Sequence, residues 1–353
     1  MLAKHNTGLR IVSIGGGTGL STLLSGLKEY VGEESSIPDW IDLLTAVVTV
    51  TDDGGSSGRL REEFQILAPG DIRNCIVALA EDRHLLTQLL RYRFESGGEL
   101  SGHSIGNILL TALTDITGDF FEAIKVISEV LAIKGRIFPS TMENARLVAK
   151  LTDGRTIEGE SKITAARSHI EKLWLAPPYC KPLPETLEAI KQAHIITIGP
   201  GSLYTSIMPN LLVDGIVEAI CNSSAIKIYI CNIMTQPGET EGFGGEDHIR
   251  ALFDYSPNLK LDYVFANSAP ISHSLREKYF ADGSVPVEFG EKAEAMFAGS
   301  EFKIIRSDFL SEDGVVRHDP QKLAQVIIDL YLTDVFGMPR FEITDLSHIE
   351  ITC

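Results

Sequence analysis

The hydrophobic residues of this chain fall into short apolar runs separated by stretches of helical periodicity. Several runs are continuously apolar and rich in Val and Ile, which is typical of parallel strands buried on both faces. Strands are predicted at residues 9–14, 44–50, 195–198, 226–231, 261–266 and 302–305. Apolar residues that recur every three or four positions predict helices at 105–116, 120–131 and 323–330.

The alternation of strands and helices predicts an α/β fold with a Rossmann-like, mostly parallel sheet and helices on both faces. Residues 71–132 read as consecutive helices, and residues 136–165 as short strands forming a hairpin about an Asp153-Gly154 turn. We therefore expect a helical and small β excursion, residues 71–190, inserted after the second strand of a single domain, residues 1–334. Residues 335–353 have weak periodicity and are expected to form a C-terminal tail.

Charge and cysteine content indicate which ligands and which cellular compartment are expected for this chain. The 353 residues include 31 Lys and Arg against 48 Asp and Glu, a formal charge of −17 that disfavours binding to nucleic acid or anionic membranes. The five cysteines are scattered and form no C-x-x-C pair, as expected for a reduced cytoplasmic protein. No apolar run reaches the roughly 18 residues of a membrane span, so membrane insertion is not expected.

Two glycine loops follow predicted strands. The first, Gly15-Gly-Gly-Thr-Gly19, leads into a helical pattern, where bare backbone N–H groups suit a phosphate. It matches neither G-x-G-x-x-G nor the P-loop, so it indicates a phosphate or nucleotide without naming one, and a tight turn is the alternative. The second, Gly199-Pro-Gly-Ser202, mirrors it, and the pair predicts a diphosphate cleft. The expected ligand-binding residues are Gly16, Gly17, Thr18, Gly19, Gly199, Gly201, Ser202 and Tyr204.

An acidic and arginine-rich segment, residues 51–61, follows the second strand. Asp52 and Asp53 are expected at the carboxyl end of that strand, where paired carboxylates bind Mg²⁺ or accept a proton. Arg59 and Arg61 offer forked donors for phosphate or carboxylate, and Ser56 offers a hydroxyl. The alternative is an Asp-Gly turn, with the arginines paired to neighbouring glutamates along a helix.

Two further segments carry polar side chains at predicted helix starts. Asp71 is expected to be a helix N-cap, and Arg73 lies on a polar face of the same helix. Ser104 and Asn107 share the polar side of the next helix, with His103 at its entrance, although a lone histidine is more often structural. These positions, together with Asn232 after a later strand, are candidates for contact with an anionic or sugar-like group.

The five segments at residues 14–21, 51–61, 69–74, 102–107 and 198–205, in this order, resemble the bacterial gluconeogenesis factor family, which is similar to 2-phospho-L-lactate transferase. The resemblance implies a nucleotide cleft at the strand ends and a cytoplasmic protein needed for cell shape and wall synthesis on gluconeogenic carbon. It implies binding of UDP-sugars such as UDP-N-acetylglucosamine, with no firmly assigned reaction. In the transferases an acid matching Asp52 lies near the acceptor and metal, so Asp52 becomes the leading metal ligand or base.

The sequence is compatible with two functions. In a nucleotide-sugar-binding regulator the glycine loops hold the diphosphate, Arg317 assists, and Tyr279 contacts the base. In a phospholactyl or phosphoryl transferase, Asp52 and Asp53 hold Mg²⁺, while arginines such as Arg59 balance developing charge. A NAD-dependent dehydrogenase is disfavoured because the dinucleotide fingerprint is absent. The expected partners are a nucleotide-sugar, the cell-wall synthesis machinery and a second copy of the chain. Mg²⁺ is the one cofactor considered, in the transferase reading.

Overall fold

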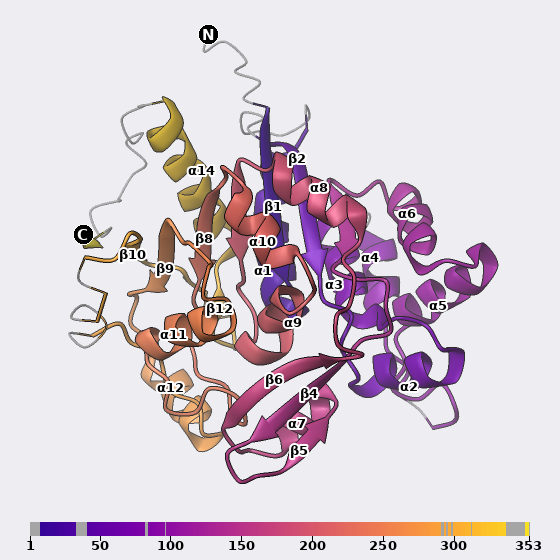
Figure 1. Cartoon of the computed structure of the whole chain (residues 1–353). Coiled ribbons are helices and arrows are strands. Elements are labelled where there is room, and N and C mark those ends of the chain that lie inside the picture. Colours follow the sequence, from indigo (N-terminus) through magenta and orange to yellow (C-terminus); the bar gives the residue numbers. More distant parts are fainter. Residues whose placement is uncertain are drawn as a thin grey trace.

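The computed structural model of the chain describes residues 8–32, 41–81, 84–95, 97–290, 293, 296–297, 299–311, 313–336 and 350–352. An eight-stranded sheet in the order β13-β10-β9-β8-β7-β1-β2-β3 runs through its centre (Figure 1). Its strands are β1 (Leu9–Gly15), β2 (Ile41–Val48), β3 (Arg136–Pro139), β7 (Ile195–Ile198), β8 (Ile226–Ile230), β9 (Tyr263–Asn267), β10 (Lys303–Ser307) and β13 (Glu350–Thr352). Only the β10–β13 pair is antiparallel, so the predicted α/β class and mostly parallel sheet are confirmed.

Both faces of the sheet are buried, and β1 shows how. Ile11 packs into a core with α1 (Gly17–Leu27), α3 (Pro69–Leu79) and α14 (Pro320–Phe336). Val12 and Ile14 point to the other face and pack into a second core. The helices of that second core are α8 (Pro184–Gln192), α9 (Met208–Leu211), α10 (Ile216–Asn222) and α11 (Gly245–Tyr255). The continuously apolar strand runs follow from this burial on both faces.

The expected helical excursion lies between β2 and β3. Its helices are α2 (Gly55–Phe64), α3, α4 (His84–Arg91), α5 (Ile105–Thr117) and α6 (Phe120–Val130), drawn in purple at the right of Figure 1. The prediction of a hairpin over 136–165 is wrong at its start, because Arg136–Pro139 pairs in parallel with β2 as the edge strand of the main sheet. The helices of the excursion supply the crossover that this parallel pairing needs.

The small β unit is a separate three-stranded sheet at the bottom of Figure 1. β4 (Arg146–Leu151) and β5 (Thr156–Glu158) form an antiparallel hairpin, and Gly154 in its turn has φ +88°. The sequence did not indicate β6 (Ile170–Ala176), which pairs with the other edge of β4. The short helix α7 (Glu160–Ala165) joins β5 to β6, and its Thr164 hydroxyl donates to Glu239 Oε1 at 3.3 Å.

One remaining element follows α1, and the others lie in the second half of the chain. They are η1 (Lys28–Tyr30), η2 (Leu203–Ile207), α12 (His273–Ala281), β11 (Leu310–Ser311) and β12 (Arg317–His318). Most of the expected tail, residues 337–349 and 353, lies outside the described residues, while Glu350–Thr352 forms β13. Among the described residues no single helix has the length and apolarity to cross a membrane, although the bent pair Leu203–Leu211 and Ile216–Asn222 meets the criterion when taken together.

Candidate functional site

The sheet changes its direction of growth between β1 and β7. From β1 the chain adds β2 and then β3 on one side, and from β7 it adds β8, β9 and β10 on the other. Ligands of open α/β sheets bind at such a switch point, outside the carboxyl ends of the strands, because the connections there diverge. The glycine loops at residues 15–19 and 199–202 follow these two neighbouring strands.

The first glycine loop packs directly against the second. α1 begins at Gly17, which has φ +60°, a conformation that favours glycine, and the N-cap residue Gly16 has no side chain to cap the helix. A Cβ on Gly19 would lie 2.5 Å from the carbonyl oxygen of Pro200. The loop therefore needs glycine at Gly17 and Gly19 for different reasons, and it presents backbone N–H groups at the start of a helix.

Side chains after β8 hold the second glycine loop in place. Gly199 and Gly201 have φ +83° and +158°. The Gly201 amide donates to Asn232 Oδ1 at 3.4 Å, and Gln236 Nε2 donates to Ser202 Oγ at 2.7 Å. Asn232, which the sequence predicted as a site residue after β8, thus positions the second glycine loop and also lines the cavity beside it.

The helical turn that follows the second loop is already capped by a carboxylate. Glu239 is 4% exposed and accepts hydrogen bonds from the hydroxyls of Thr205, at 3.1 Å, and Thr164, at 3.3 Å. The amide of Tyr204 also faces this carboxylate and lowers its pKa, but burial dominates and raises that pKa to about 7. Tyr204 itself is buried and packs edge-on against Phe243, so the structure gives this predicted ligand residue a packing role.

A cavity of about 260 Å³ lies between the two loops. Its walls come from both glycine loops, from the segment after β8, from α12 and from β12. The structure thus brings together residues that lie far apart in the sequence. The predicted ligand-binding residues that line this cavity are Gly16, Gly17, Thr18, Gly19, Gly201, Ser202, Asn232, Tyr279 and Arg317.

A second set of predicted residues forms a buried network between α2 and α5. Ser56 Oγ lies 3.0 Å from His103 Nδ1 and accepts from Asn107 Nδ2 at 3.1 Å. Ser104 is the N-cap of α5, and its hydroxyl accepts a hydrogen bond from the backbone N–H of Asn107. Burial lowers the pKa of His103, which favours the neutral ring. These residues join the two helices beside the acidic segment and do not line the cavity.

Three of the four predicted arginines have contacts within the protein. Arg61 is 1% exposed and donates to Asn144 Oδ1, at 2.8 Å, and to the carbonyl oxygens of Thr51 and Ala145. Arg59 is exposed and donates to the Ser101 carbonyl oxygen at 2.6 Å. Arg73 packs against Gly106 and donates to Asn74 Oδ1 at 2.8 Å. None of the three lines the cavity between the glycine loops.

Carboxylates lie beside the first glycine loop. α3 begins at Pro69 with Ala68 as its N-cap, so the prediction of Asp71 as a cap is wrong, because the proline starts the helix two residues earlier. The Gly17 amide donates to Asp71, whose Oδ2 lies 2.5 Å from the position of a Cβ on Gly16. Burial, and next the charge of Asp52, raise the pKa of Asp71 to about 7.

The two acids of the 51–61 segment point to different partners. Asp52 Oδ1 accepts from the Gly54 amide at 2.9 Å, and its Oδ2 lies against Gly70, the residue before Asp71. Asp53 Oδ1 accepts from the Ser161 amide at 2.9 Å and so caps the first turn of α7. Asp52 therefore belongs with Asp71, whereas Asp53 attaches the small β unit.

The resemblance implies a metal near Asp52 and the paired carboxylates indicate Mg²⁺, so the donor set can be tested for that ion. Within the described ranges no three His, Cys, Asp or Glu side chains are arranged to hold a metal ion. Mg²⁺ keeps several waters and is usually held by one or two carboxylates together with substrate phosphates. Asp52 and Asp71, beside a loop with free space for phosphates, fit that mode of binding.

Sequence reasoning missed several residues of the site. Thr22, Gln236 and His318 line the cavity; burial lowers the pKa of His318 to about 4, so that its ring is neutral at pH 7. Pro69 was the available signal that Asp71 is not a cap. For Glu160 no local signal existed, because an isolated glutamate carries no periodic or spacing pattern.

Comparisons with known proteins agree with this fold. The family model described as 2-phospho-L-lactate transferase CofD matches residues 11–310. The gluconeogenesis factor of Halalkalibacterium halodurans is 46% identical over 94% of this chain and 97% of its own length, and that of Bacillus subtilis is 43% identical over 91% and 98%. A crystal structure of a UPF0052 family member from Bacillus halodurans superposes with a TM-score of 0.83 at 45% identity, covering 91% of this chain and 99% of that one. The chain therefore belongs to the CofD family and, within it, to the gluconeogenesis factors.

Proposed function

We propose that the chain is a nucleotide-sugar-binding factor whose ligand is of the UDP-N-acetylglucosamine type. The observation that carries the proposal is the cavity between the two glycine loops at the switch point of the sheet. Backbone amides at the start of α1 that follow Gly17, whose own amide donates to Asp71, offer donors to a diphosphate. Because the net charge of the chain is −17, an anionic ligand depends on such local donors.

Each wall of the cavity has a part in this proposal. The loops at 15–19 and 199–202 would hold the two phosphates, and the guanidinium of Arg317 would pair with one of them. Tyr279 would present its ring to the base, since its hydroxyl accepts a hydrogen bond from the Val316 amide at 3.0 Å, which fixes the ring. Asn232 would supply an amide group at the end of β8.

The names of the relatives, which are gluconeogenesis factors, support the gluconeogenic part of the cellular role that we propose. The chain would act in the cytoplasm, as a homo-oligomer, on cell shape and cell-wall homeostasis during growth on gluconeogenic carbon. Its partner would be the cell-wall synthesis machinery, with the nucleotide-sugar reporting precursor supply.

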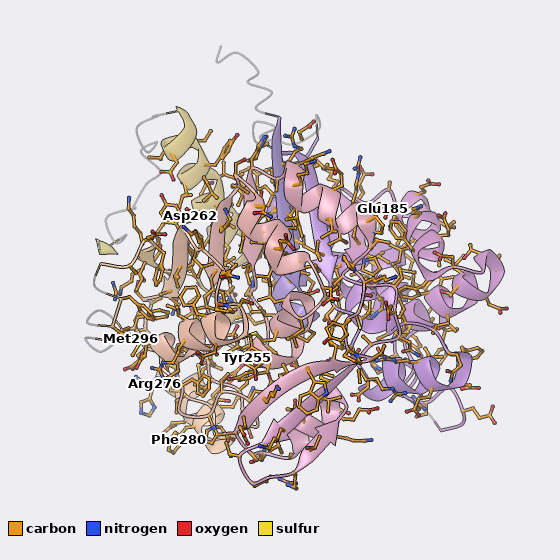
Figure 2. All side chains as sticks on the ribbon, in the orientation of Figure 1. Glu185, Tyr255, Asp262, Arg276, Phe280 and Met296 are labelled. Carbon is orange, nitrogen blue, oxygen red and sulfur yellow. The ribbon has the colours of Figure 1, made fainter. Side chains whose placement is uncertain are left out.

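Isothermal calorimetry with UDP-N-acetylglucosamine tests the binding proposal. Arg317→Gln is expected to weaken binding by a factor of roughly 10 to 100, because a charge-assisted hydrogen bond contributes roughly 1.5–3 kcal/mol. Arg276→Gln is the matched control: this exposed arginine, labelled in Figure 2, lines a different cavity and should leave affinity within about twofold. Absence of heat at millimolar ligand, with GDP and NAD equally silent, would overturn the proposal.

Asp52 and Asp71 beside the first loop support a second candidate, a phospholactyl or phosphoryl transferase acting on a nucleotide-diphosphate-linked donor. Mg²⁺ held there would supply charge stabilisation to a departing diphosphate. The chain's own residues would position the donor through the glycine loops, with Asp53 and Arg59 anchoring the neighbouring elements.

Phosphorus NMR of donor and Mg²⁺ incubated with the protein tests this candidate. Turnover that Asp52→Asn abolishes would support a transferase. If donors linked to GDP or UDP remain intact with the wild-type protein, or if Asp52→Asn leaves turnover unchanged, the candidate fails.

A further inference from the structure

A second open space, of about 870 Å³, borders the cavity between the glycine loops. Its walls are residues 242–244 with the first turn of α11, the helix α12, and the segment 284–290 that follows α12. Ser284 lines both spaces, and so α12 stands between them, with Tyr279 toward the cavity of the glycine loops. We call the larger space the α12 groove.

One face of α12 is turned to this groove. The residues of α12 that line it are His273, Arg276, Glu277 and Phe280. Their spacing of three, four and seven positions places them on one side of a helix. Leu275 and Tyr279 lie on another side and pack against a small apolar cluster that includes Ile271. None of the nine residues of α12 is buried, so its groove face is not covered by the described part of the chain.

The α12 groove has an apolar component. Phe280 is 73% exposed and is labelled at the lower left of Figure 2. Phe243, Val285 and Pro286 line the same groove, so this exposed ring does not stand alone. Aromatic rings beside further apolar walls are typical anchor points of protein interfaces, because covering them removes a large apolar area from water.

The charge of the groove decides which partner fits. Its acidic lining residues are Glu246, Asp247, Glu277 and Glu288, whereas within the described ranges its basic ones are Arg276 and His273. The exposed carboxylate of Glu288 has no ion pair or hydrogen bond in the described part of the chain, and Glu277 pairs there only with His273, at 3.6 Å. Asp247 pairs with Arg250 at 3.2 Å. Such a surface repels phosphates and anionic lipids and attracts Lys and Arg side chains.

The backbone of the groove walls is fixed by hydrogen bonds. The Gly245 amide, at the start of α11, donates to the Glu288 carbonyl oxygen at 2.9 Å. The Ser284 amide donates to the carbonyl oxygen of Tyr279, also at 2.9 Å, and so joins the end of α12 to the segment after it. Walls that are already in place lower the ordering cost of binding.

We propose that the α12 groove docks a basic segment of a partner protein, with Lys or Arg side chains against Glu277 and Glu288 and an apolar side chain against Phe280. A small amine would use the carboxylates but leave the ring uncovered. A second copy of this chain is a poor occupant, because its net charge of −17 opposes an acidic groove. The proposal goes beyond nucleotide binding and does not depend on it.

Fluorescence anisotropy of a labelled peptide in which Arg and Leu alternate tests the proposal on the full chain. The same peptide with Glu in place of every Arg is the charge control, and spermine is the control for a small cation. The Arg-Leu peptide is expected to bind at least tenfold more tightly than the Glu-Leu peptide, because only its charges complement the groove.

Variants then locate the binding. Glu277→Lys combined with Glu288→Lys reverses two exposed charges and should weaken binding of the Arg-Leu peptide at least tenfold, and Phe280→Ala should weaken it at least threefold. Glu185→Lys combined with Glu188→Lys is the matched control, because it makes the same change in net charge on α8, far from Phe280 in Figure 2. This control should keep the affinity within twofold, and thermal unfolding checks that each variant folds.

Three results would overturn the proposal. The first is that the Arg-Leu peptide does not bind or binds no better than the Glu-Leu peptide. The second is that the double variant in the groove loses no more affinity than the double variant on α8. The third is that spermine displaces the peptide at equal concentration while Phe280→Ala leaves peptide affinity unchanged, because the groove would then be a site for small cations.

Discussion

Replacing Asp71 by asparagine is expected to stabilise the protein at pH 8. In the folded chain, burial and the charge of Asp52 raise the pKa of Asp71 from its ordinary value of 3.8 to about 7. Between these values the folded state holds a proton that the unfolded state has released, so stability falls as pH rises through this window. Asparagine keeps an oxygen to accept the Gly17 amide but cannot ionise.

The magnitude follows from the displacement of the pKa. Each pH unit corresponds to about 1.4 kcal/mol, so ionised Asp71 costs the folded state up to about 4 kcal/mol at pH 8. We therefore expect Asp71→Asn to gain about 1–4 kcal/mol at pH 8 and nothing near pH 4. His318 acts with the opposite sign, because its lowered pKa of about 4 makes stability rise with pH up to 6.5, but its effect cancels between wild type and variant.

Urea unfolding in EDTA at pH 5, 6.5 and 8 measures the difference. Asp153→Asn is the control of opposite sign, because hydrogen bonds from Arg155 lower the pKa of exposed Asp153 to about 2, and its loss should not stabilise the protein at any pH in this range. The reasoning is refuted if Asp71→Asn is no more stable than wild type at pH 8, or if its advantage is the same at pH 5.

Three further changes test the packing of the site. Gly19→Ala places a Cβ 2.5 Å from the Pro200 carbonyl oxygen and should cost about 1–3 kcal/mol in urea unfolding and weaken nucleotide binding, whereas Gly97→Ala, with open space around it, should do neither. Arg61→Gln should cost about 3–5 kcal/mol in urea unfolding, because it strands buried partners of the guanidinium; a cost below 1 kcal/mol would contradict that role. Ser56→Ala should lower the unfolding free energy by about 1–3 kcal/mol, since His103 loses its buried hydroxyl partner, and an unchanged urea midpoint would contradict this.

The strands were predictable where burial on both faces requires a run of apolar residues in the sequence. β1, β7 and β8 are covered on both faces, which forces nearly continuous apolar sequence. β3 has only four residues, begins with arginine and ends with proline, and it is a strand because the edge of β2 is available to it. Its assignment depends on a pairing partner about 90 residues earlier in the chain, which no local pattern encodes.

The residues of the candidate site likewise fall into those that a local sequence pattern predicts and those whose roles depend on the tertiary fold. Both glycine loops were predictable, since strand, glycines and helix follow one another within a few residues. The arginines show the limit: Arg59 and Arg61 stand two positions apart in one motif, yet Arg59 is exposed while Arg61 is buried among backbone carbonyls. Which face of α2 meets the small β unit decides their roles, and that contact is set by the tertiary fold.

The small β unit gives this site a character that the sheet alone would lack. A switch point with two glycine loops offers donors to any nucleotide diphosphate. The small β unit adds contacts at this edge, because Asp53 accepts from the Ser161 amide of α7 and Glu239 accepts from the hydroxyls of Thr164 in α7 and Thr205 after the second glycine loop. Two carboxylates therefore join the small β unit to the segments that form the candidate site.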